Sequence, residues 1–279
     1  MEPKGNRIEN WEHQYKPLEV TYTEETNTPV NLEQMHSYQV VHDHIVNYLP
    51  NSQSAKILEV GCGGARNALY LAIRGFDITC SDFAPEGIRL AQTNFNAFGA
   101  KGTFLQDDLM NSTIPDGSFD CIMSFGLLEH FEELSPVIRN LTRMVKPGGI
   151  QIHLIIPKKF STQTIMNLFW FPFRLAKNIV KGQDLRGIIK RSYRDFPHYE
   201  NKFSWREYCS AFVEEGNKII KCEPGGLIIP FISLPSGMGI PIVKIFDNQI
   251  IWLNELVRHS MSRLVYFFAQ TITIVCAKT

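Results

Sequence analysis

The chain has 279 residues, of which 44% are hydrophobic, enough to bury the core of one large α/β domain with room for an insertion. Its 28 basic residues balance its 28 acidic residues, so the net charge indicates no particular class of partner. The charged N-terminus, the absence of a CxxC pair among six cysteines and the lack of about 20 consecutive apolar residues argue against a secretory signal, a zinc site and a spanning helix. We therefore expect a cytoplasmic protein with reduced thiols.

Strand and helix patterns alternate through the first half of the chain. We predict helices at residues 31–49, 67–74, 84–98 and 134–145, and strands at 56–60, 76–80, 103–106, 119–124 and 150–156. Alternation at this spacing predicts right-handed βαβ units, and hence a mostly parallel sheet with helices on both faces. Ligands of such sheets bind beyond the carboxyl ends of the strands.

The alternation stops at Pro157 and resumes near residue 204. Beyond that point we predict helices at 204–216 and 243–268, and strands at 218–222 and 271–277. The prolines and glycines between residues 227 and 240 argue against a long helix there. Residues 1–30 have the pattern of an irregular or partly helical arm.

The strongest motif is the glycine cluster Glu59-Val-Gly61-Cys-Gly63-Gly-Ala-Arg66, which follows a predicted strand and precedes a predicted helix. Glycines in such a turn let the backbone approach a ligand closely. Nicotinamide, flavin and S-adenosylmethionine sites all use a loop of this kind. The dinucleotide fingerprint requires a glycine at position 66, where Arg66 would crowd the pyrophosphate. Glu59, two residues before the first glycine, is typical of a methyltransferase loop.

Carboxylates follow the next two predicted strands. Asp82 lies about twenty residues beyond the glycine loop, where a carboxylate can accept both hydroxyls of a ribose. Asp108 follows the third strand, where an acceptor suits the exocyclic amine of adenine and the backbone amide of Leu109 suits a ring nitrogen. Each aspartate alone is more often a turn or cap residue. Because these residues and the glycine loop lie at three successive strand ends, a nucleoside site is favoured.

Four stretches resemble, in order and spacing, the landmarks of the class I S-adenosylmethionine-dependent methyltransferases, in particular the small-molecule type (type 11/12-like). They are residues 57–72, 115–120, 128–130 and 146–149, and residues 199–222 resemble the late helix and sixth strand more weakly. The resemblance implies a Rossmann-like, doubly wound, seven-stranded α/β sheet, mostly parallel with the last strand antiparallel, and an inserted helical cap. It divides the chain into an N-terminal helical arm (1–50), a cofactor-binding core (51–157), a cap insertion (158–200) and the C-terminal part of the core (201–279) with a second cap segment (224–245).

The same resemblance implies S-adenosyl-L-methionine as the cofactor and S-adenosyl-L-homocysteine as the product. Gly61, Cys62 and Gly63 would contact the methionine part through their backbone. Glu59 would brace the loop or reach the amino group through a water molecule. The family's third glycine is Ala65 here, and we expect its added methyl group to shift the loop slightly.

The matching positions at the other strand ends would contact the rest of the cofactor. Asp82 would hold the ribose, and Phe83 would lie beside the adenine. Two contact regions complete the implied cofactor site, namely the adenine edge at Asp108 and Leu109 and the neighbourhood of the sulfonium at Ser124 and Phe125.

His130 is the candidate catalytic residue. Methyl transfer from a sulfonium is an in-line displacement with a neutral leaving group, so the alignment of nucleophile, methyl group and sulfur is the main requirement. A hydroxyl or ammonium acceptor also gains from a general base. His130 follows the fourth strand and could serve as that base, although a structural role is the alternative. No His, Asp or Glu cluster has metal-ligand spacing, so we predict no metal site.

The charge of the predicted cap insertion bears on the substrate. Residues 158–194 contain nine basic residues and one acidic residue, a net charge of +8, and include an apolar, aromatic run at 165–173. This combination suits an anionic membrane surface with peripheral contact at the inner face, a lipid-like substrate, or an anionic small molecule. A cap that packs its aromatics on the core is the simpler alternative. Aromatics and charges do not interleave as in base-stacking surfaces, which disfavours nucleic acid.

We therefore expect transfer of a methyl group to a small-molecule acceptor that is hydrophobic, lipid-linked or anionic. The accepting atom and the oligomeric state stay open. One alternative is a catalytically silent protein that binds S-adenosylmethionine and acts through a partner. The other is a nicotinamide-dependent oxidoreductase, against which Arg66 and the missing glycine argue.

Overall fold

The computed structural model describes residues 15, 18–49, 51–157, 202–225, 236–260, 266, 269 and 271–279. The predicted cap insertion, including the basic segment 158–194, lies outside the described residues. So do residues 1–14 of the predicted arm and residues 226–235 of the second cap segment.

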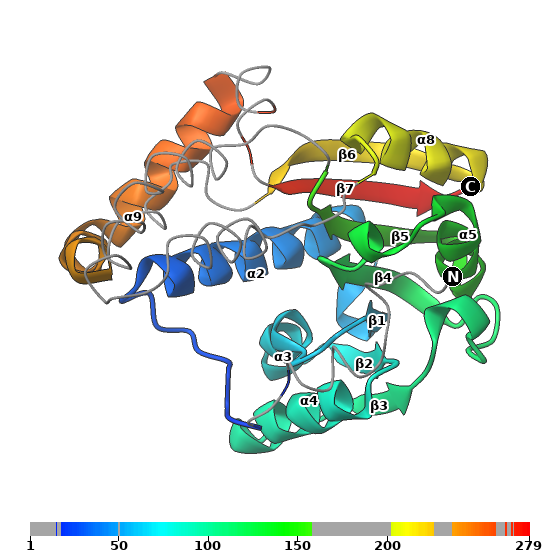
Figure 1. Ribbon diagram of the computed structural model, residues 1–279, viewed down its shortest axis with the longest axis horizontal. Helices are drawn as coiled ribbons and strands as arrows, with labels where there is room; N and C mark the ends of the chain where they lie inside the picture. Colours follow the sequence, from blue (N-terminus) through cyan, green and yellow to red (C-terminus); the bar gives the residue numbers. More distant parts are fainter. Residues whose placement is uncertain are drawn as a thin grey trace, which may run out of the picture.

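One sheet organises the part of the chain that the structure describes (Figure 1). Its seven strands follow the order β3-β2-β1-β4-β5-β7-β6. The strands are β1 (Lys56–Val60), β2 (Asp77–Asp82), β3 (Thr103–Gln106), β4 (Phe119–Phe125), β5 (Val145–Ile155), β6 (Asn217–Gly225) and β7 (Thr271–Lys278). Strands β1 to β5 pair in parallel, whereas β7 runs antiparallel to both β5 and β6. The predicted fold class, a mostly parallel sheet with an antiparallel last strand, is confirmed.

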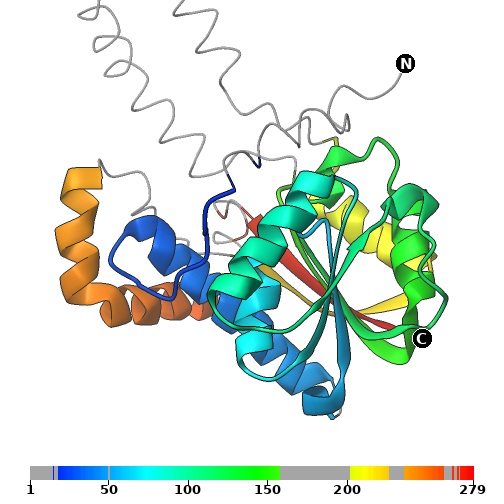
Figure 2. The same ribbon diagram turned by 90° about the horizontal axis from the view of Figure 1, so that it is seen from below.

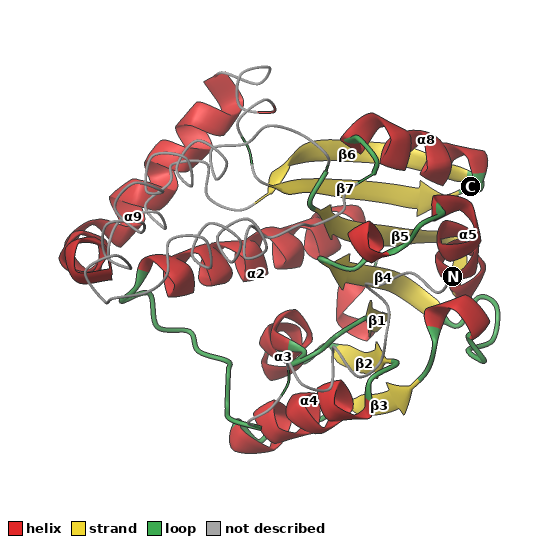
Figure 3. Cartoon of the chain, in the orientation of Figure 1, coloured by secondary structure: helices red, strands yellow, loops and turns green. Residues whose placement is uncertain are grey.

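Helices alternate with the strands along the chain (Figure 3). They are α2 (Pro29–Tyr48), α3 (Arg66–Ile73), α4 (Pro85–Ala97), α5 (Leu134–Met144), α8 (Trp205–Glu214) and α9 (Ser236–Ser260). Several begin with the capping signals that the sequence carries. Thr28 accepts the Asn31 amide at the start of α2, and Ser204 forms a reciprocal capping box with Glu207 at the start of α8.

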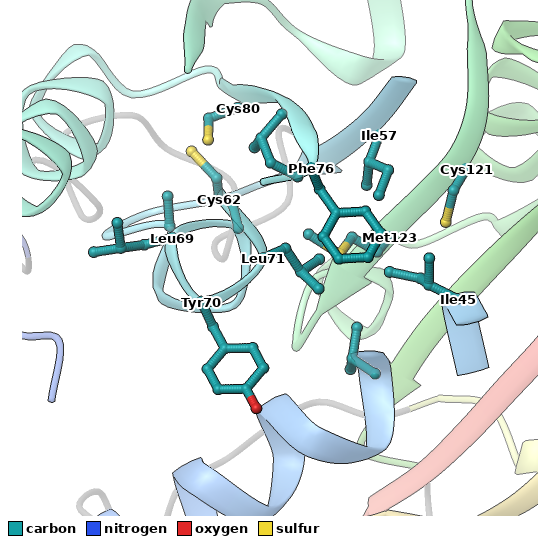
Figure 4. Close-up of a cluster of buried hydrophobic side chains, with 14 of the residues drawn as sticks. Ile45, Ile57, Cys62, Leu69, Tyr70, Leu71, Phe76, Cys80, Cys121 and Met123 are labelled. Carbon is teal, nitrogen blue, oxygen red and sulfur yellow. The ribbon is translucent and has the colours of Figure 1, made fainter. Parts of the chain in front are cut away.

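Two apolar cores lie on opposite faces of the sheet. Helices α2, α3 and α4 cover one face, and α5 and α8 cover the other, as Figure 2 shows. Along β1 the side chains alternate, so that Ile57 enters the first core and Leu58 the second. Figure 4 shows part of the first core, where side chains from α2, β1, α3, β2 and β4 meet.

The strand order places the site. After β1 the chain crosses to β2 on one side of the sheet, and β4 pairs with the other side of β1. Neighbouring crossovers therefore diverge at the carboxyl ends of β1 and β4, and this divergence opens a crevice in doubly wound sheets. The glycine loop, Asp82 and residues 124–130 all lie at that edge.

Two elements differ from their predicted bounds by more than three residues. The Lys146-Pro-Gly-Gly149 segment lies inside β5, because the β4–β5 register shifts between Phe119 and Cys121 and absorbs the extra residues as a bulge. Helix α9 begins at Ser236 instead of residue 243 and includes Pro241, contrary to our prediction for residues 236–240. Its backbone leaves helical geometry at Phe246 (φ −128°), which marks a kink. No helix among the described residues is long and apolar enough to cross a membrane.

A chain of buried polar side chains crosses the face of the sheet that α5 and α8 cover. The Asn217 side-chain amide donates to Thr142 Oγ1 (2.8 Å) and to the Phe212 carbonyl (3.0 Å), and its oxygen accepts from Gln151 Nε2 (2.7 Å). Asn217 is 3% exposed. Because water cannot replace these partners in the core, the network fixes where β6 and α8 pack on the sheet.

Replacing Asn217 with Ala should lower the free energy of unfolding by about 2–4 kcal/mol, because several buried polar groups lose their partner together. Urea unfolding followed by circular dichroism measures the change. Asn96→Ala is the matched control, because Asn96 is exposed on α4 and its loss should change stability by less than about 0.5 kcal/mol. An equal effect of both substitutions would show that the network contributes nothing specific.

Candidate functional site

The glycine loop between β1 and α3 is built from three residues in left-handed backbone geometry, Gly61 (φ +64°), Gly63 (φ +48°) and Ala65 (φ +50°). A Cβ atom at Gly61 would come within 2.6 Å of the Leu127 side chain, so a larger residue there would displace Leu127 and strain the left-handed backbone. Ala65 keeps the conformation that a third glycine would have, at a cost of about 1 kcal/mol for its Cβ. The glycine-like geometry of the turn is thus retained at position 65, with a buried methyl group.

Glu59, in β1, braces the glycine loop through a hydrogen bond with α3. Its Oε2 accepts the Ala68 amide at 2.8 Å, in the first turn of α3, where Ala65 offers no side-chain cap. The carboxyl group is 3% exposed, and its burial raises the pKa of Glu59 to about 8, although the Ala68 hydrogen bond lowers it in part. Glu59 therefore replaces the missing helix cap, which is one of the two roles that the resemblance implied.

Asp82 ends β2 and ties two turns together. Its Oδ2 accepts the Gly63 amide at 2.8 Å, and its Oδ1 accepts the Ala84 amide at 2.9 Å. Burial raises the pKa of the Asp82 carboxyl group, while hydrogen bonds from the Ala84, Gly63 and Phe83 amides oppose the shift. Each oxygen keeps a further lone pair, so a diol such as a ribose could still bind the carboxylate.

The predicted adenine end of the site lies at the carboxyl edge of β3. Asp108 is exposed and accepts the Met110 amide (3.0 Å) and the Asn111 side-chain amide (2.9 Å), so it caps the short 3-10 helix Leu109–Asn111. Leu109 is buried and its carbonyl accepts from Asn140 Nδ2 (2.9 Å). Phe83, half-buried, follows Asp82 directly. The structure therefore gives Asp108 a capping role, and its role toward adenine stays a prediction.

Ser124, near the carboxyl end of β4, turns its side chain away from the glycine loop and into the core that α5 and α8 cover. The Ser124 Oγ lies 2.7 Å from His153 Nδ1, and His153 stacks on Phe212 with ring centroids 4.8 Å apart. Burial lowers the pKa of His153 to about 3, so this histidine is neutral at pH 7. The Ser124 side chain therefore cannot contact a sulfonium bound beside the glycine loop, and only its backbone could do so. Phe125, which is half-buried, is the last residue of β4.

Two titratable residues follow β4 in the short 3-10 helix Leu128–His130. Burial lowers the pKa of His130, partly offset by a hydrogen bond with the Gly126 backbone, so the neutral ring dominates at pH 7. Glu129 is 6% exposed, and no other residue that the structure describes donates a hydrogen bond to either of its carboxylate oxygens. Burial therefore raises the pKa of Glu129 to about 7. The sequence prediction overlooked Glu129, because nothing local distinguishes it from a solvated glutamate.

A second overlooked residue is Asn94 of α4, which is fully buried. Its side-chain amide donates to the Gly64 carbonyl at 2.6 Å and to Thr21 Oγ1 at 3.0 Å. Asn94 thus joins the glycine loop to a residue of the N-terminal arm. An asparagine inside an amphipathic helix carries no local sign of that contact.

The assembled residues suit the cofactor that the resemblance implies. Left-handed turns at Gly61 and Gly63 keep side chains off the loop surface, and the Asp82 carboxylate is fixed 2.8 Å from the Gly63 amide. A second carboxylate, on Asp108, lies at the end of the neighbouring strand. A turn without side chains, a diol acceptor and a second carboxylate at three adjacent strand ends would suit the methionine, ribose and adenine parts of S-adenosylmethionine.

Comparisons with known proteins agree with this geometry. Residues 58–153 match the family model described as a methyltransferase domain. A ubiquinone biosynthesis O-methyltransferase of Rickettsia felis is 31% identical over 110 residues, which are 39% of this chain and 45% of that protein. A 2-methyl-6-phytyl-1,4-hydroquinone methyltransferase of Synechocystis is 31% identical over 115 residues, which are 41% of this chain and 36% of that protein.

Solved structures show the same fold. A SAM-dependent methyltransferase of Methanosarcina mazei aligns with a TM-score of 0.51 at 18% identity, covering 86% of this chain and 96% of the other. The chain matches less than half the length of the two curated relatives, so the likeness in sequence concerns one shared domain.

The raised pKa of Glu129 predicts a pH-dependent stability. Between pH 4.5 and about pH 7 the folded protein binds more protons at this site than the unfolded chain does, so the site's contribution to stability falls as pH rises. Glu129→Gln should remove this pH-dependent loss of stability, because the glutamine side chain does not ionise. At pH 8 the variant should be more stable than the wild type by an amount on the order of 2 kcal/mol, with a smaller difference at pH 4.5.

Thermal unfolding at the two pH values measures this difference. Glu132→Gln is the matched control, because Glu132 is exposed three residues further on and should change stability little at either pH. If Glu129→Gln lowered the stability at pH 8, the carboxylate would have to be ionised and paired in the folded protein.

Proposed function

We propose that the protein transfers a methyl group from S-adenosylmethionine to a small-molecule acceptor, through the methyltransferase domain that residues 58–153 match. The observation that carries the proposal is the 2.8 Å hydrogen bond from the Gly63 amide to Asp82, which brings the glycine loop and the diol acceptor together at one sheet edge. Two curated relatives that share this domain are named as methyltransferases of small quinone-type molecules.

The residues at the strand ends would divide the cofactor between them. The backbone of Gly61, Cys62 and Gly63 would hold the methionine part, with Glu59 as the brace of the loop rather than a direct contact. Asp82 would bind the ribose. The adenine would be contacted by Phe83, Asp108 and Leu109. The backbone of Ser124, together with Phe125, would lie near the sulfonium. Bound S-adenosylmethionine supplies an electrophilic methyl group, and these residues fix its orientation.

His130 is the proposed general base. It follows β4, on the same edge as the glycine loop, and its lowered pKa keeps the ring neutral and able to accept a proton at pH 7. A hydroxyl acceptor loses its proton as the new bond to the methyl carbon forms, so a neutral imidazole nearby lowers the barrier. The preceding residue, Glu129, is buried.

For the acceptor class, the proposal favours a hydrophobic or lipid-linked molecule. The Synechocystis relative is named for a phytyl-bearing hydroquinone, and the Rickettsia relative for the biosynthesis of ubiquinone. In this chain, residues 158–194 combine an aromatic run with a net charge of +8, which suits peripheral contact with an anionic membrane. An anionic water-soluble acceptor is the other outcome that the following experiment distinguishes.

The purified protein would be incubated with methyl-labelled S-adenosylmethionine and an extract of its source organism, and the product partitioned between organic solvent and water. We expect label in the organic phase. Label among small aqueous molecules would overturn the lipid-linked acceptor but keep the methyltransferase. Cofactor binding without any transfer would instead support the silent, partner-dependent alternative.

Asp82→Ala tests the proposed ribose role in a separate binding experiment. Loss of charge-assisted hydrogen bonds to the cofactor should weaken S-adenosylhomocysteine binding about 10- to 100-fold, measured by titration calorimetry. Because Asp82 also accepts two backbone amides, a thermal scan must show that the variant is folded. A folded Asp82→Ala protein with wild-type affinity would refute the ribose role.

The role of His130 predicts a pH profile. Protonation of a general base abolishes its function, so kcat should fall as pH drops through the pKa of His130, which lies below the ordinary value of 6.5. His130→Gln should lower kcat about 10²- to 10⁴-fold and flatten the profile, while S-adenosylhomocysteine affinity stays unchanged.

His42→Gln is the matched histidine control, because His42 lies on α2 beside Asp43, in the first core layer, and should keep both kcat and the pH profile. An unchanged kcat in His130→Gln would leave His130 with a structural role alone.

A further inference from the structure

The N-terminal arm is fastened to the glycine loop at a defined point. The Thr21 amide donates to Asn94 Oδ1 at 2.8 Å, and Asn94 in turn donates to Thr21 Oγ1 and to the Gly64 carbonyl. Beside this point Tyr22 is 4% exposed and packs its ring against Tyr38 and Phe98. The arm therefore reaches the loop through buried contacts rather than lying free on the surface.

Beyond this fastening point, the Tyr15 ring lies on the glycine loop. A Cβ atom built on Gly63 would lie 3.0 Å from Tyr15 Oη and 3.1 Å from its Cε1. On the other side, a Cβ atom built on Gly87 would lie 3.2 Å from Tyr15 Cε2 and 3.1 Å from Asp82 Cγ. The Tyr15 ring thus packs against two glycines, one before α3 and one in the first turn of α4, where a Cβ atom would crowd it.

Tyr15 covers the polar groups that the proposed cofactor site needs. With the ring in place, Asp82 is 3% exposed and Gly63 is buried. Burial, and then the negative charge of Asp82 and the nearby Cys62, raise the pKa of the Tyr15 hydroxyl. The phenol of Tyr15 therefore stays protonated at neutral pH.

We propose that Tyr15 is a cofactor-binding residue that forms the wall of the site between Gly63 and Asp82 and retains the bound cofactor. The inference rests on the proposed function. It also gives a reason for Gly87, since glycine in the first turns of a helix costs up to about 1 kcal/mol relative to alanine and no turn at this position requires it. The ring is held by the arm, so the cofactor and the arm stabilise each other's position.

Titration calorimetry and stopped-flow dissociation with S-adenosylhomocysteine test the proposal without reference to turnover. Tyr15→Ala should raise Kd at least 10-fold, mainly through faster dissociation, and Tyr15→Phe should recover most of the affinity because it restores the ring. Leu18→Ala, on the same arm and exposed, is the matched control and should bind as the wild type does.

Gly87→Ala tests the same contact from the opposite side. Alanine favours the helix, so the variant should fold at least as well, but its Cβ would crowd the Tyr15 ring at 3.2 Å and should weaken S-adenosylhomocysteine binding in the same direction. In the Tyr15→Ala background, the effect of Gly87→Ala should shrink to the part that comes from Asp82, whose Cγ would lie 3.1 Å from the same Cβ atom.

The outcomes separate the two proposals. A wild-type protein that does not bind S-adenosylhomocysteine overturns the proposed function itself. A wild-type protein that binds it, with Tyr15→Ala binding equally well or more tightly, overturns the role of Tyr15 alone. Tighter binding would identify the ring as a plug that competes with the cofactor.

The rate of Cys62 alkylation in the cofactor-free protein gives a third test. A general loss of stability would expose all thiols and not Cys62 alone. Cys62 neighbours Tyr15 and is 7% exposed. In Tyr15→Ala, alkylation of Cys62 should accelerate relative to Cys209, which is partly exposed and distant in sequence. Equal acceleration at both thiols, or at neither, would contradict local covering by Tyr15.

Discussion

The hydrogen bond between the Gly63 amide and the Asp82 carboxylate is the contact on which the geometry of the site depends. It joins the loop after β1 to the end of β2, two segments that are nineteen residues apart in the chain. The parallel register, which pairs Val60 with Ser81, brings them to the same edge. A turn with left-handed residues could adopt other shapes, and the buried carboxylate selects one of them because leaving either partner unpaired there would cost free energy.

The site is surrounded by carboxyl groups whose environments differ. Asp82 accepts the Gly63 and Ala84 amides, Glu59 accepts the Ala68 amide, and no other residue in the described part of the chain donates to either Glu129 oxygen. Burial raises the pKa of all three. Groups that are shifted in this way concentrate at functional sites, since a structure built for stability alone would place apolar side chains there. Glu129, whose raised pKa links its ionisation to stability, directly precedes His130, the proposed general base.

Packing around the glycines adds a second constraint. Gly61 faces Leu127, Gly63 faces Tyr15, and Gly64 faces Thr21 and Asn94. Because these glycines have no side chains, Leu127 after β4 and residues of the N-terminal arm can pack directly on the glycine loop. These contacts enclose the Gly63–Asp82 edge, so an arm far from the motifs in sequence becomes part of the site they define.

The sequence by itself determined the alternation of strands and helices, the glycine loop and the carboxylates at successive strand ends, because these features follow from local patterns of hydrophobicity and backbone freedom. It also predicted that Glu59 could brace the loop. Tertiary structure decided which way the remaining side chains face. Ser124 points toward His153, since alternation along β4 turns it into the core beneath α8. Glu129 loses its solvent, and Asn94 and Tyr15 meet the loop, because each depends on partners more than twenty residues away or on burial that no local pattern encodes.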